Sequence, residues 1–225
     1  MDTWQRTKVL LKEDYRKIQE LSVLVLGLGG VGSYVVESLA RLGVKKLILV
    51  DYDTIDATNI NRQIEALHST IGFYKADILK QRVLDIHPTC EVQVIKEKIT
   101  PENLDLLFLE ATDFLVDAND TVSVKKELMK RCVRIGQRFI MSMGTANKLD
   151  PTKLKIMDLK DTKYDPLAKI LRKEARKEKI YTKIPVVSSS EIPIKTMENT
   201  LGSISFVPSV AGLLITSYIT SEVLK

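Results

Sequence analysis

The chain has 225 residues, 44% of them hydrophobic and 28% charged, with a formal charge of +5 at neutral pH. This size predicts a single domain, 1–225, with a substantial core, and the sequence shows no repeat or low-complexity tract, which excludes a repeat protein. The chain starts without a basic, apolar signal run, so we expect a cytoplasmic protein.

The first predicted elements are a helix, a short strand and a glycine turn. Residues 8–20 have the spacing of an amphipathic helix, and an apolar strand at 23–26 runs into a turn and a second helix. This is the G-x-G-x-x-G nucleotide fingerprint in its required context. Gly27 permits the tight turn, Gly29 lets a phosphate approach the backbone, and Gly32 allows close packing of helix on strand. Free N–H groups and the helix dipole then face the anion.

The second predicted strand, 46–50, ends at Asp51, which is placed to accept hydrogen bonds from a ribose. These features alone predict a nucleotide site and favour NAD. The polar loop that follows changes the prediction, because it holds Asn59 and Arg62, and because Lys75 begins the next helix. Two cations beside the phosphates suit a site that breaks a triphosphate, where charge builds up as pyrophosphate leaves. We expect both cations at exposed positions.

Strands and helices go on alternating as far as residue 145, with strands predicted at 91–95, 114–117 and 138–143. The alternation predicts a Rossmann-like α/β fold, a mostly parallel sheet with helices on both faces, and a nucleotide-binding core at about 20–145. The strand at 114–117 ends in acidic residues, at Asp117 and Asp120, where a magnesium ion can be held.

A C-terminal strand/helix portion follows at about 150–225. Segments 153–157 and 184–188 are predicted to pair at a sheet edge, and 191–202 to form either a mobile loop over the site or a simple surface connection. Residues 207–224 are the most apolar stretch, but polar residues interrupt it and it falls short of the about 20 residues that span a bilayer. We therefore expect a buried or dimer-facing helix and no membrane association.

A basic helix is predicted to begin at Pro166, capped by Asp165. Its apolar residues, Ile170 among them, are expected to face inward, and its other sides carry Lys169, Arg172, Lys173, Arg176 and Lys177. These residues fit either a solvated helix face or a surface for RNA phosphates.

The sequence has two cysteines. Cys132 falls on an apolar stripe at helical spacing and is predicted to be a packed core thiol, whereas Cys90, just before a strand, is expected to be partly exposed. No C-x-x-C pair is present, so we expect no structural zinc, and thioester or persulfide chemistry is disfavoured.

Taken together, the nucleotide motifs resemble those of the ubiquitin-activating-like (ThiF/MoeB-type) adenylyltransferases. The motifs are Gly27-x-Gly29-Gly30-x-Gly32, Asp51-x-Asp53, Asn59-x-Asn61-Arg62-Gln63, Lys75 and Asp120. Within that superfamily, segments 143–152, 165–169 and 202–212 are similar to the tRNA threonylcarbamoyladenosine dehydratases.

The resemblance implies ATP and Mg²⁺ as cofactors and assigns a role to each motif residue. The nucleotide would be bound by Gly27, Gly29, Gly30, Gly32, Asp51, Asp53, Asn59, Arg62 and Lys75. Asp120, rather than Asp117, would hold the metal. Arg6 would reach across a twofold interface to the γ-phosphate in the partner, which implies a homodimer, and tRNA would be the partner of the basic helix.

The implied function is an ATP-dependent dehydratase. The threonine carboxylate of threonylcarbamoyladenosine in tRNA attacks the α-phosphorus of ATP, while Arg62, Lys75, Arg6 and magnesium stabilise the departing pyrophosphate. A tethered atom of the same side chain then closes a ring and releases AMP, so no enzyme nucleophile is required.

Two alternatives stay open at this stage. The first is an adenylyltransferase that activates the C-terminus of a ubiquitin-like sulfur-carrier protein, against which the missing zinc cysteines count. The second is a nucleotide-binding scaffold or NAD-dependent oxidoreductase that shares only the first βαβ unit. A sulfur-transfer protein stays open as a further partner.

Overall fold

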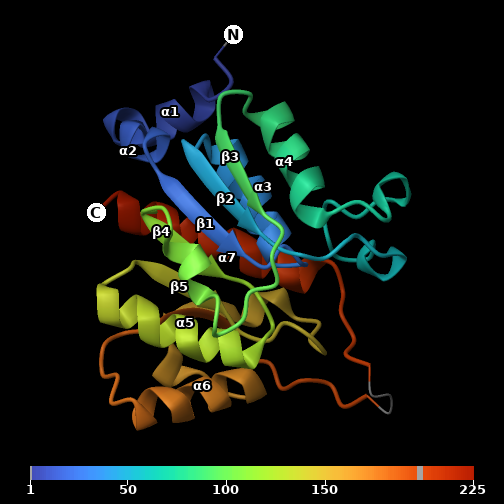
Figure 1. The fold of residues 1–225 in the computed structure, drawn as a ribbon, viewed down its shortest axis with the longest axis vertical. Coiled ribbons are helices and arrows are strands. Elements are labelled where there is room, and N and C mark those ends of the chain that lie inside the picture. Colours follow the sequence, from blue (N-terminus) through green and yellow to red (C-terminus); the bar gives the residue numbers. More distant parts are fainter. Residues whose placement is uncertain (1, 197–199) are drawn as a thin grey trace.

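Seven strands form one sheet in the order β3-β2-β1-β4-β5-β7-β6 in the computed structural model, which describes residues 2–196 and 200–225 (Figure 1). All neighbouring strands run parallel except β6 and β7. The strands are β1 Ser22–Leu26, β2 Lys46–Val50, β3 Glu91–Ile95, β4 Phe114–Asp117, β5 Phe139–Ser142, β6 Leu154–Asp158 and β7 Pro185–Ser189. The predicted Rossmann-like α/β class is confirmed, as is the edge pairing of the two C-terminal strands.

Helices cover both faces of the sheet because successive strand residues point to opposite sides. In β1, Val23 and Val25 contribute to a core with helices α3, α4 and α7, whereas Leu24 and Leu26 pack into a second core with α5 and α6. These helices are α3 Gly32–Leu42, α4 Lys75–Ile86, α5 Val122–Ile135, α6 Pro166–Lys177 and α7 Phe206–Val223.

The N-terminal segment is not the single helix that its spacing predicts. It forms α1 (Gln5–Leu11), a 3₁₀ turn and α2 (Tyr15–Gln19), because Lys12 has a positive φ of +52° that no α-helix continues through. Trp4 anchors α1 at the amino ends of the strands, where its indole N–H donates to the carbonyl of Arg41 at 3.0 Å. Helix α1 itself has no buried residue.

Helix α7 runs across the sheet against α3 (Figure 1). In the described part of the chain it is the one helix long and apolar enough to cross a membrane by length and composition, so the prediction that the segment is too short was wrong. Val207, Ala211, Ile215 and Ile219 are nevertheless fully buried in the core. Gly212 permits the close approach to α3, because a Cβ there would lie 2.6 Å from the carbonyl oxygen of Val31.

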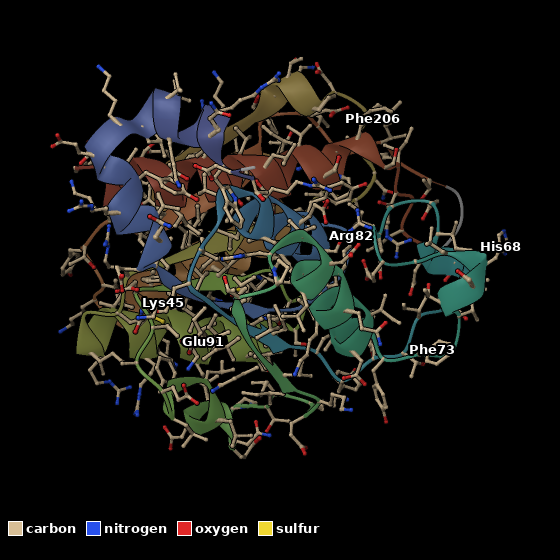
Figure 2. The ribbon with its side chains drawn as sticks, turned by 90° about the horizontal axis from the view of Figure 1, so that it is seen from above. Lys45, His68, Phe73, Arg82, Glu91 and Phe206 are labelled. Carbon is tan, nitrogen blue, oxygen red and sulfur yellow. The ribbon has the colours of Figure 1, made fainter. Side chains whose placement is uncertain are left out.

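The connection from β2 to α4 extends away from the body of the molecule, as both figures show. Figure 2 labels His68 and Phe73 on this extension and Arg82 on the helix that follows it. Arg82 donates to the Glu37 carboxylate of α3 at 2.5 Å, which ties the two helices together. The predicted loop 191–202 lies partly outside the described residues, at 197–199.

Candidate active site

A cleft of about 420 Å³ opens at the carboxyl ends of β1 and β4. These strands are neighbours whose onward connections leave in opposite directions along the sheet, and ligands bind at such a point in α/β folds. Of the predicted nucleotide residues, the cleft is lined by Gly27, Gly29, Gly30, Asp51, Asp53, Asn59, Arg62 and Lys75, together with the predicted metal ligand Asp120.

Two glycines are dictated by the fold itself and a third is not. Gly27 has φ +85°, and a Cβ on Gly32 would lie 1.8 Å from the carbonyl oxygen of Gly27. At Gly29, by contrast, a Cβ would meet protein only at 3.7 Å, an ordinary contact with the Gln63 side chain. Protein packing therefore does not require glycine at position 29, which fits a residue kept small for an approaching ligand.

The Asp51 carboxylate joins the glycine turn to the end of β2. Its two oxygens accept hydrogen bonds from the backbone N–H of Leu28 at 2.7 Å and of Asp53 at 2.8 Å. Burial raises the pKa of Asp51, and these two N–H groups oppose the rise. Each carboxylate oxygen has a second lone pair, so the predicted ribose contact stays chemically available.

Lys75 is not at an exposed position, contrary to the prediction. Its side chain is 8% exposed, and its ammonium lies 3.0 Å from the Asp53 carboxylate. The reason is that Lys75 is the first residue of α4. Side chains of a helix lean back towards its N-terminus, and for Lys75 this direction leads to the loop that carries Asp53. The fold thus holds the cation in the cleft wall with its counter-ion already in place.

Arg62 is partly exposed and partly engaged by its own loop. One guanidinium nitrogen donates to the carbonyl of Thr58 at 2.9 Å and to the Asn61 side chain at 2.8 Å. The Asn59 side chain accepts from the backbone N–H of Asp56 at 3.1 Å, which closes the turn that carries both residues. A guanidinium has five N–H donors, so Arg62 keeps donors for a ligand in the cleft.

The structure separates the two acidic residues that follow β4. Asp117 is fully buried, and its carboxylate pairs with the equally buried Lys125 at 3.0 Å. Asp120 is exposed on the rim of the cleft. Of the two, Asp120 is therefore the carboxylate open to a ligand.

Several cleft residues were not nominated from the sequence. Gln63 is buried with an unpartnered side-chain oxygen, and its place in the same polar motif as Arg62 is the signal that could have found it. Thr145 and Ser203 also line the cleft. They fall in two of the three segments that resembled the dehydratase branch, yet nothing in their local sequence indicates a contact with a nucleotide motif.

The structure does not bring Arg6 to the cleft of its own chain. Arg6 is exposed on α1, and α1 lies at the amino ends of the strands, the end of the sheet opposite to the cleft (Figure 1). Within one chain, Arg6 therefore cannot contact a ligand bound in the cleft.

The basic helix α6 is capped as predicted, since the Asp165 carboxylate accepts from the N–H of Ala168 at 2.8 Å. Ile170 was wrongly expected to face inward and is 40% exposed. The inward face is made by Ala168, Leu171 and Ala175, which recur at the i, i+3 and i+7 spacing of one helix side. Of the predicted RNA-binding residues, Lys169, Lys173, Arg176 and Lys177 are exposed and Arg172 is half-buried.

Both cysteines are buried, so the prediction for Cys132 is confirmed and that for Cys90 is wrong. Cys90 packs into the core beneath the start of β3, and burial raises the pKa of its thiol to about 11. Burial raises the pKa of Cys132 to about 12. Neither thiol forms the thiolate that nucleophilic chemistry needs at neutral pH.

A glycine turn at the switch point of a parallel sheet, with cations around it, defines a nucleotide-binding α/β protein built for phosphate chemistry. The model of the ThiF family matches residues 5–221, and the chain belongs to this family. It is 41% identical to the tRNA threonylcarbamoyladenosine dehydratase of Bacillus subtilis, over 95% of this chain and 91% of that protein. The corresponding Escherichia coli dehydratase is 36% identical over 68% of this chain and 58% of its own length.

Solved structures agree with this assignment. The crystal structure of Escherichia coli tRNA N6-threonylcarbamoyladenosine dehydratase in complex with AMP superposes with a TM-score of 0.93 at 29% identity, covering 100% of this chain and 96% of that one. The ATP complex of the same enzyme gives 0.92. Escherichia coli MccB, at 19% identity and a TM-score of 0.69, shares the fold alone.

Proposed function

We propose that this protein is an ATP-dependent dehydratase that adenylates the carboxylate of threonylcarbamoyladenosine in tRNA and promotes its cyclisation, releasing pyrophosphate and AMP. The observation that carries the proposal is the cleft, which gathers a glycine turn, Arg62, Lys75 and Asp120 from four separate segments. Similarity to the Bacillus subtilis dehydratase extends over 95% of the chain, so it includes all four of these segments.

The cations act on the triphosphate. The glycine turn and the N-terminus of α3 receive phosphate oxygens through backbone N–H groups, and Asp51 accepts from the ribose. Arg62 offers a planar fork to phosphate oxygens and Lys75 a point charge, and both favour the charge that gathers on the leaving pyrophosphate. For Lys75 to turn to a phosphate, its contact with Asp53 must be exchanged, which the partly exposed Asp53 carboxylate permits by turning to water.

Magnesium is part of the proposal, with Asp120 as its protein ligand. The described residues contain no group of three or more His, Cys, Asp or Glu side chains that could hold a metal on their own. That fits Mg²⁺, which typically binds through one or two carboxylates, substrate phosphates and water. When bound there, the ion would neutralise charge on the phosphate oxygens.

Ring closure needs no nucleophile from the enzyme. Once the carboxylate is joined to AMP, the attacking atom is tethered in the same side chain, and proximity alone supplies a large rate advantage. In the described structure no cysteine lines the cleft, and both thiols are buried. These facts support direct cyclisation over the sulfur-carrier alternative, in which a cysteine commonly takes part.

We propose further that tRNA lies along α6. The exposed basic residues of this helix provide an electrostatic footprint for phosphates. Near its C-terminal end, Arg172 and Arg176 line a hollow of about 340 Å³ together with Tyr181, which is 87% exposed. Arg172 also donates to the carbonyl of Thr162 at 2.9 Å, so it braces the helix as well. A cytoplasmic location is part of this proposal, and a sulfur-transfer partner is not needed for it.

A homodimer completes the proposal. Arg6 is exposed far from its own cleft, so it can serve a phosphate only in a partner, and α1 exposes Val9 and Leu10 beside it, at 74% and 79%. Mixing Arg6→Ala and Lys75→Ala subunits tests this arrangement. Each variant homodimer should be weak, whereas a mixed dimer holds one site with both cations intact and should recover activity towards half of wild type. Heterodimers that form without any recovery would refute sharing of Arg6.

Nucleoside analysis tests the function itself. Purified protein, ATP–magnesium and tRNA carrying threonylcarbamoyladenosine should yield a nucleoside lighter by one water, together with one AMP per product. Lys75→Ala should form both at a rate about 10²–10³-fold lower. An unchanged nucleoside mass with wild-type protein would refute the dehydratase assignment, and calorimetry showing tighter binding of NAD than of ATP would favour the oxidoreductase alternative.

A further inference from the structure

One wall of the cleft is built by the C-terminal part of the chain and has no part in the nucleotide roles above. Thr145, which follows β5, and Ser203, which precedes α7, provide its lining. Segments 147–150 and 191–194 support these two residues through hydrogen bonds to each other and to Gly202. The wall thus unites three stretches that are far apart in sequence.

Asn147 is the residue at which these stretches meet. Its backbone N–H donates to the Gly202 carbonyl at 2.8 Å, and its side-chain oxygen accepts from the Gly202 N–H at 2.6 Å. Its own carbonyl accepts from the N–H of Ile194 at 2.8 Å. One residue therefore holds both ends of the segment 194–202. It does so in a left-handed conformation, φ +58°, which asparagine adopts more readily than most residues.

The surroundings of Asn147 are braced in the same way. The buried Lys148 ammonium donates to the Gly144 carbonyl at 2.9 Å, and the Gly144 N–H donates to Asp165 at 2.9 Å. Asp165 also caps α6, so the start of the basic helix is joined to the residue before Thr145. The Glu191 carboxylate accepts from the backbone N–H of Asp150 at 2.9 Å.

On its other side the wall reaches the nucleotide motif. The Asn61 side chain donates to the carbonyl of Ser203 at 3.1 Å, and Pro208, on the same stretch, contacts Gly30 closely enough that a Cβ there would lie 3.2 Å away. The wall is therefore continuous with the phosphate end of the cleft and with the start of α6. A nucleic acid lying on α6 and a triphosphate on the glycine turn would both border it.

We infer that this wall is the subsite for the carboxylate-bearing nucleoside and that Asn147 is the positioning residue that holds it. The inference rests on the proposed function. The threonine carboxylate must approach the α-phosphorus of ATP in the same cleft. The residues assigned to the nucleotide and its metal all lie at or before Asp120 in the sequence. The remaining wall is lined by Thr145 and Ser203, whose hydroxyls are neutral groups able to donate to a carboxylate or a ribose. Asn147 acts through the geometry of 202–203 and touches no substrate itself.

Three substitutions at Asn147 separate its two structural tasks. Asn147→Asp keeps an acceptor oxygen and tolerates the left-handed conformation, so it should retain near-wild-type kinetics. Asn147→Gly keeps the backbone conformation but loses the acceptor for the Gly202 N–H. We expect it to raise the KM for tRNA about tenfold, the effect of one lost hydrogen bond at the upper end of the usual range. Asn147→Ala adds backbone strain and should raise the KM further, while kcat and the Kd for ATP stay within about twofold in all three.

Asp113→Ala is a matched control. The Asp113 carboxylate also accepts from a backbone N–H in a distant segment, that of Ser22 at 2.8 Å, but at the amino ends of the strands. It should lower stability without changing the KM for tRNA. The inference is overturned if Asn147→Gly keeps the wild-type KM for tRNA, or if its Kd for ATP rises in parallel. Because glycine adds no backbone strain, Asn147→Gly still tests the inference if Asn147→Ala fails to fold. Failure of wild-type protein to dehydrate tRNA would instead refute the proposed function.

Discussion

The buried ion pair between Lys125 and Asp117 is expected to control the stability of the fold and the position of the loop that carries Asp120. Both side chains are fully buried, and the Lys125 ammonium lies 3.0 Å from the Asp117 carboxylate. The same ammonium donates to the backbone carbonyls of Asp117 at 3.3 Å and Ser142 at 3.0 Å, so its three donors are used at the ends of β4 and β5. Lys125→Met preserves most of the volume and removes the charge.

The magnitude follows from what the substitution leaves behind. Asp117 would keep only its hydrogen bonds from Asn119, and one of its carboxylate oxygens already has no hydrogen-bond partner. Breaking a buried pair on one side typically costs about 3–5 kcal/mol, against about 5–15 kcal/mol for the free energy of unfolding of an ordinary domain. Asp117→Asn combined with Lys125→Met removes both charges and should recover much of the loss.

Urea unfolding followed by circular dichroism at pH 7 measures these differences. Burial raises the pKa of Asp117 and Lys125 opposes the rise, so removal of the lysine raises that pKa further. The folded variant then binds a proton more tightly than the unfolded chain does. Its stability deficit should therefore shrink as the pH falls towards 4. A loss below about 1 kcal/mol for Lys125→Met, or a double variant no more stable than the single one, would refute the reasoning.

Three further predictions concern the cleft and the thiols. Lys75→Ala or Arg62→Ala should lower the adenylation rate by about 10²–10³-fold with an unchanged circular dichroism spectrum, because each removes a donor to the leaving pyrophosphate; rates near wild type would contradict the roles proposed. Replacing Cys90 and Cys132 by alanine should preserve cyclisation, since both thiols are buried with a raised pKa, and a folded but inactive protein would favour thioester chemistry. Burial raises the pKa of Glu65 from 4.5 to about 7, so this group should cost up to about 3 kcal/mol of stability as the pH rises from 4.5 to 7. Glu65→Gln should flatten the pH dependence of the urea midpoint in that range, and an unchanged slope would contradict it.

Several features of the fold could be predicted because local sequence patterns encode them. Alternation of apolar strands with helices predicted the sheet, and the glycine spacing predicted the turn at Gly27, because a strand, a left-handed residue and a helix start must follow one another there. The capping of α6 by Asp165 was equally local, since Asx capping involves residues three apart. Resemblance to a family then singled out Arg62, Lys75 and Asp120 among many polar residues.

Which of these groups are buried, and what they contact, depends on how distant segments pack together. Lys75 begins an amphipathic helix and gives no local sign that it lies beneath the loop against Asp53. Asp117 and Asp120 are three residues apart and chemically alike, yet one is neutralised by Lys125 and the other is open. The wall held by Asn147 joins residues 55 positions apart. Such contacts arise from the packing of distant segments, and periodicity along the chain carries no information about them.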